Sequence, residues 1–226
     1  MPIKFNVNQI LKPFQVKLLQ LFFATDFARP FFLTGGTALA AFYLGHRESK
    51  DFDFFSLEQF DPEAMKRAVD EIAAKTGASV NYKVRSQTYN EVYLTNKQEQ
   101  WEQRIDIVQE QPVYFGELET VKGIVVDNLD NIGSNKILAI YGRFEPKDYI
   151  DLYFLIKKAR FKFDRLFEMA KRKDLGLFEF YWANCLYPID ELEVLPRMKQ
   201  VLSIKELTEF YRALRKKLLK KAKPLK

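Results

Sequence analysis

Cysteine and histidine are nearly absent from this sequence of 226 residues, which holds one of each. The single Cys185 excludes an internal disulfide and a cysteine-built zinc site, as is usual in a reducing compartment. One histidine likewise excludes a histidine-built metal site, and no serine or cysteine triad can be assembled. The sequence also lacks an apolar run long enough to span a membrane and the ordered regions of a signal peptide. We therefore expect a soluble, cytoplasmic protein with no membrane partner.

Hydrophobic residues make up 47% of the chain and aromatic residues 15%, which is enough for a sizeable core. The net charge of +6 comes from the C-terminus, because residues 212–226 hold 8 basic and no acidic residues. Such clustering favours an anionic partner, most commonly nucleic acid. A solvated helix face is the alternative explanation.

Two aspartates one residue apart are the most informative feature. Side chains alternate along a strand, so Asp51 and Asp53 share one face while Phe52, Phe54 and Phe55 are expected to enter the core. Two carboxylates on one face of a rigid strand suit Mg²⁺ or Mn²⁺, which prefer oxygen ligands.

A glycine pair and a third aspartate strengthen this prediction. Gly35 and Gly36 form a strand-to-helix turn whose N–H groups can bind phosphate, and Thr37 is a plausible cap of the helix that follows. Asp106 would join the first two acids if its strand pairs beside theirs. Converging acids that hold metal ions are typical of nucleotidyl transfer. The alternative is that Asp106 is only an exposed strand residue.

The hydrophobic periodicity predicts an α+β protein with a mixed-sheet half, residues 1–130, and a helical half, residues 131–226. The two halves are expected to pack around an active cleft. Strands are expected over 31–34, 51–56, 79–86, 91–95 and 104–108, with an extended stretch over 114–126. Helices are expected over 8–25, 38–44, 62–76, 131–142, 147–158, 164–173, 177–186 and 204–221.

Two blocks of the sequence resemble a known family. GGTALAAFYLGHRESKDFDFF and, later, KILAIYGRFEPKDYIDLYFL are similar to the signatures of the AbiEii-type nucleotidyltransferase toxins, minimal nucleotidyltransferases of the polymerase-beta-like superfamily. The resemblance implies a nucleotidyltransferase fold and the use of an NTP with Mg²⁺ or Mn²⁺. It also implies nucleotide transfer to RNA, such as a tRNA 3′ end, and a cognate antitoxin.

The resemblance and the patterns above together give a set of expected site residues. The expected nucleotide-binding residues are Gly35, Gly36, Thr37, Ser49, Lys136, Arg143 and Asp148. The expected catalytic residues are Asp51, Asp53, Asp106, Lys136 and Asp151, of which Asp51, Asp53 and Asp106 would bind the metal.

Other interpretations stay open at this stage. Lys136 and Arg143 are seven residues apart and would share a helix face, but Asp148 and Asp151 could form only local helix salt bridges. The acceptor could be a small molecule or a protein hydroxyl in place of RNA. The chain could also be a nucleotide- or RNA-binding module without catalysis, although such a module need not keep three mutually repelling acids.

Overall fold

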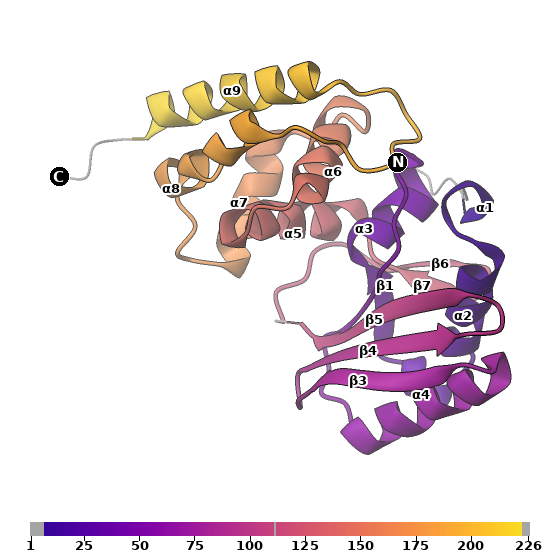
Figure 1. Cartoon of the computed structure of the whole chain (residues 1–226). Helices are drawn as coiled ribbons and strands as arrows, with labels where there is room; N and C mark the ends of the chain where they lie inside the picture. The colour runs from indigo at the N-terminus through magenta and orange to yellow at the C-terminus, as the bar shows by residue number, and fades with distance from the viewer. Residues whose placement is uncertain (1–6, 111, 223–226) are drawn as a thin grey trace. The chain divides into compact units, whose positions relative to one another are not determined.

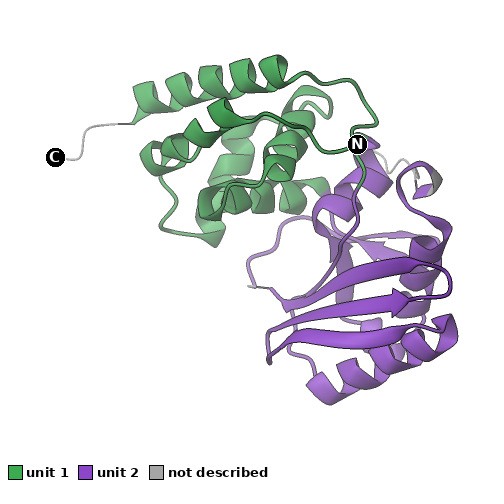
Figure 2. Ribbon diagram, viewed as in Figure 1, with its two compact units in different colours: residues 1, 46–48, 129–226 green, residues 2–45, 49–128 purple. Residues whose placement is uncertain are grey.

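The computed structural model describes residues 7–110 and 112–222, and it contains two compact units (Figure 1). The sheet unit comprises the chain up to residue 45 and residues 49–128. The helical unit comprises residues 46–48 and the chain from residue 129 (Figure 2). Three residues from the N-terminal part of the sequence therefore belong to the helical unit.

The sheet unit is built on a seven-stranded mixed sheet of order β3-β4-β5-β2-β1-β7-β6. β2 pairs parallel with β5 and antiparallel with β1, so it lies near the centre. The strands are β1 (Phe31–Thr34), β2 (Phe52–Ser56), β3 (Ser79–Arg85), β4 (Tyr89–Asn96), β5 (Trp101–Gln109), β6 (Glu119–Val121) and β7 (Ile124–Val126).

Helices of the sheet unit begin and end where local residues dictate. In α4 (Pro62–Thr76) the Asp61 carboxylate accepts a hydrogen bond from the Glu63 amide at 2.9 Å, and Gly77 ends the helix at a φ of 62°. The predicted helix over 62–76 is confirmed. The other helical segments are α1 (Val7–Ile10), α2 (Pro13–Phe23), η1 (Asp26–Ala28), α3 (Gly35–Ala38) and the π-helix η2 (Leu39–Leu44).

The predicted helix over 8–25 is wrong in its continuity, because α1 ends at Ile10 and α2 begins at Pro13. Proline has no N–H to donate and is tolerated at the first position of a helix, so it starts α2. The Phe22 ring of α2 then stacks on Phe54 of β2 with centroids 3.7 Å apart.

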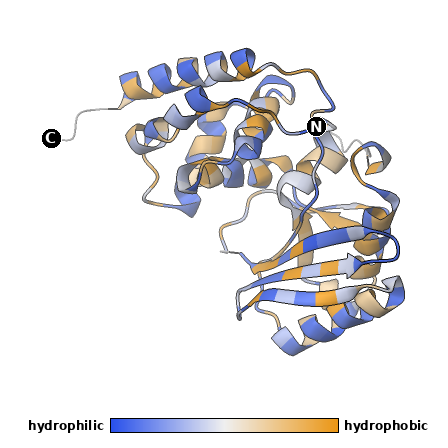
Figure 3. Cartoon of the chain, in the orientation of Figure 1, coloured by the Kyte–Doolittle hydropathy of each residue, from blue (hydrophilic) through white to orange (hydrophobic). Residues whose placement is uncertain are grey.

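Burial alternates along β2, and the hydropathy pattern of the sheet is visible in Figure 3. Phe52 and Phe54 are fully buried, as predicted. Phe55 is only half-buried, so its predicted place in the core is wrong. It lies on the same face as Asp53 because side chains two positions apart share a face.

Helices alone form the second unit apart from residues 46–48 and short connections. They are α5 (Leu129–Gly142), α6 (Pro146–Lys157), α7 (Phe163–Lys173), α8 (Glu179–Asn184), η3 (Tyr187–Glu191) and α9 (Ile204–Lys221). The core contains Trp182, whose indole N–H donates to the Ile137 carbonyl at 2.9 Å, and Tyr211, whose hydroxyl donates to the Tyr149 carbonyl at 2.6 Å. None of the described helices is long and apolar enough to cross a membrane. The predicted α+β class is confirmed.

Candidate active site

The turn after β1 brings the backbone against a carboxylate. Gly35 has a φ of 70°, a conformation that favours glycine. A Cβ atom at Gly35 would overlap the Asp53 carboxylate, so only glycine permits this approach. The helix begins at Gly35, with Thr34 as its N-cap residue. The prediction that Thr37 caps the helix is therefore wrong.

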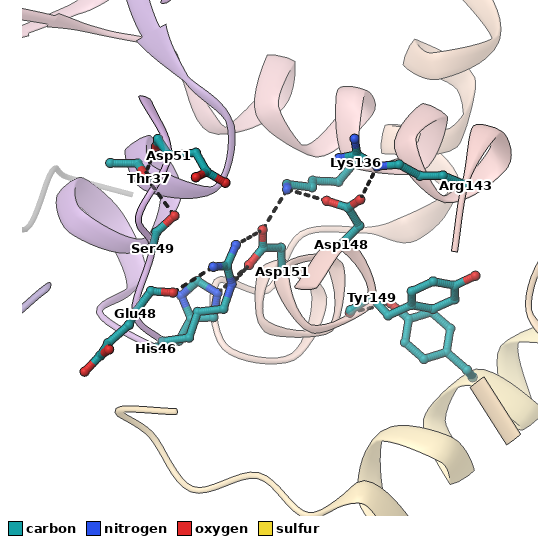
Figure 4. A network of polar contacts seen from close by, with 12 residues as sticks. Thr37, His46, Glu48, Ser49, Asp51, Lys136, Arg143, Asp148, Tyr149 and Asp151 are labelled. Atoms are coloured by element: carbon teal, nitrogen blue, oxygen red, sulfur yellow. Dashed lines mark hydrogen bonds and ion pairs between the residues drawn. The ribbon is translucent and has the colours of Figure 1, made fainter. Parts of the chain in front are cut away.

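Thr37 instead supports the segment that leads into β2. Its fully buried hydroxyl donates to the Asp51 carbonyl at 2.5 Å and lies 2.8 Å from the Ser49 hydroxyl (Figure 4). The carbonyl of Lys50, which lies between Ser49 and Asp51 in the sequence, accepts hydrogen bonds from the Gln15 and Gln103 side chains. The backbone just before Asp53 is thus held by side chains from three other segments.

The three predicted acids come from neighbouring strands. Asp53 of β2 lies directly beside Asp106 of β5, which confirms the predicted pairing of the two strands. Asp51 is the residue before β2 and faces the same way as Asp53. Arg104 binds Asp106 through Nη2 at 2.9 Å. Burial, supported by the nearby charges of Glu91 and Asp51, raises the pKa of Asp106 although Arg104 opposes the shift.

Proteins can bind Mg²⁺ through their own side chains alone or through a few carboxylates that substrate phosphates complete, and these acids fit the second arrangement. Among residues 7–110 and 112–222, no three His, Cys, Asp or Glu side chains are placed to enclose a metal by themselves. Magnesium commonly binds one or two carboxylates together with substrate phosphates. Half-buried Asp51 and Asp53 beside the glycine turn match this second arrangement.

A second polar cluster lies in the helical unit. Lys136 of α5 is 8% exposed and binds two acids of α6, Asp148 at 2.7 Å and Asp151 at 2.8 Å (Figure 4). Arg143, whose side chain is 57% exposed, also binds Asp148, at 3.0 Å. The structure therefore brings together four predicted site residues in one ion-pair network.

Asp151 also holds the short segment 46–48. Arg47 donates to both of its carboxylate oxygens at 2.7 Å, and the His46 Nε2 lies 2.8 Å from Oδ1. The backbone of the same segment pairs with residues 197–200, where the Lys199 amide donates to the His46 carbonyl at 2.8 Å. The sequence did not reveal the Arg47–Asp151 pair, because a contact across 104 residues leaves no local pattern.

The pKa values of the network follow from its pairs. Burial alone would raise the pKa of Asp151, but Arg47 and Lys136 hold it well below its usual value. Burial opposes the charge of Lys136 as well, yet Asp151 and Asp148 raise its pKa. Both members of the pair are therefore charged at neutral pH.

The geometry of the glycine turn and the acids agrees with the comparisons. Residues 17–224 match the family described as "Nucleotidyl transferase AbiEii toxin, Type IV TA system". The chain belongs to this family of nucleotidyltransferase toxins. Its resemblance to AbiEii proteins, inferred above from two sequence blocks, is confirmed, and the protein is a nucleotidyltransferase.

Individual relatives agree with the AbiEii assignment in fold. An uncharacterised protein of Aquifex aeolicus is 30% identical over 167 residues, which span 72% of this chain and 75% of that protein. A candidate nucleotidyltransferase from Helicobacter pylori has a TM-score of 0.58 at 18% identity and covers 94% of this chain and 100% of its own. The nucleotidyltransferase toxin MenT4 of Mycobacterium tuberculosis has a TM-score of 0.51 at 11% identity, with 93% and 83% covered.

Proposed function

We propose that this AbiEii family member is a metal-dependent enzyme that moves a nucleoside monophosphate from an NTP to an RNA hydroxyl, such as a tRNA 3′ end. The observation that carries the proposal is the placement of Asp53 against the Gly35 turn and beside Asp106 of the neighbouring strand, with Asp51 two residues earlier and its carbonyl bound by Thr37. Carboxylates repel each other because they carry the same charge, so holding them close together costs free energy unless a cation binds. A phosphate-bound metal would remove that cost.

Asp51 and Asp53 are the proposed metal ligands, and Asp106 is the proposed third ligand. A bound Mg²⁺ or Mn²⁺ would activate the acceptor hydroxyl and stabilise the leaving pyrophosphate. Arg104 neutralises Asp106 through its ion pair in the ligand-free protein. We propose that the pair loosens when Asp106 takes part in binding.

In the sheet unit the proposed phosphate contacts are the backbone of Gly35 and Gly36, and in the helical unit the proposed phosphate contact is the guanidinium of Arg143, whose side chain is 57% exposed. Thr37 and Ser49 have hydroxyls that hold each other and the Asp51 backbone, so their proposed role is to set the position of Asp51. In the helical unit Asp148 binds Arg143 and Lys136, and Lys136 also binds Asp151, so the proposed role of Lys136, Asp148 and Asp151 is to set the position of Arg143.

The basic C-terminal helix supports RNA as the acceptor, with fewer available cations than the sequence suggested. Its apolar face is buried and consists of Leu207, Tyr211, Leu214 and Leu218. Four cations of this helix, expected to be free, bind acids of the same unit. Arg212 and Arg215 bind Asp190, while Lys217 and Lys221 bind Asp164.

Two lysines of α9 are available to bind a partner. Lys216 and Lys220 are exposed and have no ion-pair partner within the part of the chain that the structure describes. Lys223 and Lys226 of the predicted basic tail lie outside the described residues. We propose that Lys216 and Lys220 contact RNA phosphates. The proposed antitoxin could compete for the same surface.

The test of the proposed function is incubation of the purified protein with each labelled NTP, Mg²⁺ or Mn²⁺, and total cellular RNA. We expect one NTP to label RNA, most strongly in the tRNA fraction, and omission of the metal to abolish labelling. Labelling of a small molecule or a protein alone would replace RNA as the acceptor. NTP binding without transfer to any acceptor would favour the non-catalytic module.

The RNA surface has a separate test with a matched control. Replacing Lys216 and Lys220 with Gln should flatten the salt dependence of RNA binding by about 1.4 slope units, at roughly 0.7 per phosphate contact with a single strand. Replacing Lys217 and Lys221 makes the same charge change on the same helix, but these lysines already bind Asp164. If both double variants show the same salt dependence of RNA binding, α9 is not part of the RNA-binding surface.

A further inference from the structure

A buried carboxylate outside the predicted site binds the residue that precedes the glycine turn. Asp127, at the end of β7, is fully buried. Its Oδ2 accepts a hydrogen bond from the Thr34 hydroxyl at 2.5 Å. Its Oδ1 accepts from the Tyr114 hydroxyl and from the Asn128 amide, both at 2.8 Å. The carboxylate is thus surrounded by donors from three segments.

The backbone of Asp127 is tied to the same region. Its amide donates to the Leu33 carbonyl at 2.9 Å, and its carbonyl accepts from the Tyr43 hydroxyl at 2.7 Å. The bond to Leu33 belongs to the parallel pairing of β7 with β1, in which Leu33 lies opposite Val126. Asp127 therefore fixes both the end of β1 and the end of the π-helix η2 that follows the turn.

A carboxylate buried this deeply is costly unless donors satisfy it, so each of its hydrogen bonds constrains the partner strongly. Thr34 is one of these partners, and it is also the N-cap residue immediately before Gly35. On its other side, Gly35 lies against the Asp53 carboxylate. The turn is therefore held between Asp127 and the acid that we assign to metal binding.

We propose that Asp127 is a positioning residue that, through the Thr34 hydroxyl, holds the Gly35–Gly36 turn in the conformation that binds the NTP phosphates. The inference rests on the proposed function, because it assigns the turn to nucleotide binding. Asp127 does not touch the nucleotide in this arrangement, since its side chain is fully buried and engaged by Thr34, Tyr114 and Asn128.

Two single substitutions separate positioning from general stability. Thr34→Val removes the donor that connects Asp127 to the turn, whereas Tyr114→Phe removes a different donor from the same carboxylate. Thr34→Ser keeps the hydroxyl and serves as the rescue variant. The readouts are NTP affinity by calorimetry, amide hydrogen exchange over residues 31–45 without nucleotide, and the melting temperature.

We expect Thr34→Val to weaken NTP binding about three- to tenfold, the equivalent of one net hydrogen bond, and to speed exchange over the turn. Tyr114→Phe should lower the melting temperature to a similar degree but change neither affinity nor exchange at the turn, and Thr34→Ser should resemble the unaltered protein. If Thr34→Val and Tyr114→Phe change NTP affinity and amide exchange at the turn to the same degree, Asp127 is only structural. If the unaltered protein binds no NTP, the proposed function fails, while exchange alone still decides whether Asp127 holds the turn.

Discussion

The acids of the sheet unit and the acids of the helical unit lie in opposite electrostatic surroundings. Asp51, Asp53 and Asp106 are half-buried in or next to two neighbouring strands, and burial, Glu91 and Asp51 raise the pKa of Asp106 more than its partner Arg104 lowers it. In the helical unit Asp148 and Asp151 are fully buried, yet their pKa values are lowered, because burial is outweighed by Lys136, Arg143 and Arg47.

This difference separates a ligand site from a structural network. A buried acid with several cationic partners is already compensated, so it needs nothing from solution. Acids that repel each other are most stable when a cation binds. The sheet acids should therefore govern activity, and the helical acids should govern stability.

The largest expected effect is on turnover, from Asp51→Asn or Asp53→Asn. A catalytic metal supplies several kcal/mol of transition-state stabilisation, so we expect the rate to fall by roughly a hundredfold or more. Stability should change little, because both side chains are only half-buried and asparagine has nearly the same shape as aspartate. Nucleotide transfer and thermal melting measure the two quantities. Glu102→Gln, an exposed acid on β5, is the control; full activity in the Asp51/Asp53 double variant would refute the metal assignment.

The reverse pattern is expected for Asp151→Asn. It leaves Arg47 and Lys136 without half of their compensating charge, and breaking a buried pair typically costs about 3–5 kcal/mol. For a chain of this size that corresponds to a fall in melting temperature of about 10 °C. Asp190→Asn also removes an acid with two arginine partners, but one at the surface, and should cost at most about 1 kcal/mol. Similar losses for both variants would contradict the comparison.

Much of the fold could be predicted because its signals are local. The caps of α4, the alternation along β2 and β5, and the buried face of α9 each depend on residues a few positions apart, and each is confirmed. The errors are local competitions that the sequence does not resolve. For example, α3 begins at Gly35 with Thr34 as its N-cap residue, and the Thr37 hydroxyl donates to the Asp51 carbonyl instead of capping the helix.

The residue types of the site could be predicted from the sequence, but most of the contacts between these residues could not. Asp106 was expected to join Asp51 and Asp53 on the condition that its strand pairs beside theirs, and the structure fulfils this condition for Asp53. The partners of Asp151 and Asp127 lie about a hundred residues away in the sequence, at Arg47 and Thr34. Such pairs depend on how helices and strands pack, and no spacing rule encodes them.

Phosphate binding tests whether any residue of the helical network also binds a ligand. Arg143 and Lys136 belong to this network but differ in exposure. We expect Arg143→Ala to weaken triphosphate binding about tenfold, as for a lost charged hydrogen bond, with little effect on a monophosphate. Lys136→Ala should show the same preference together with a loss of stability. Titration with both ligands measures this, and Lys158→Ala is the exposed control. Equal losses for both ligands would make Lys136 structural.

The smallest expected effect is a pH dependence of stability through His46. Burial lowers its pKa below 6.5; Asp151 opposes this shift, while Arg47 and Lys136 support it. The folded protein therefore keeps His46 neutral, and its Nδ1 has no hydrogen-bond partner among the described residues. The unfolded chain takes up a proton near pH 6.5, so this stability is complete above that pH and is lost as the pH falls toward the folded pKa.

His46→Gln provides the measurement, because glutamine can still donate to Asp151 but does not titrate. Unfolding by urea between about pH 7.5 and pH 5 should show the unaltered protein losing up to about 1.4 kcal/mol per pH unit relative to the variant. A stability difference that stays constant over this range would mean that the pKa of His46 is the same in the folded and unfolded chains, and one that favours the unaltered protein more as the pH falls would mean that the imidazole is charged in the folded state. The network would then hold three cations against Asp151, and its assignment as a balanced structural cluster would be wrong.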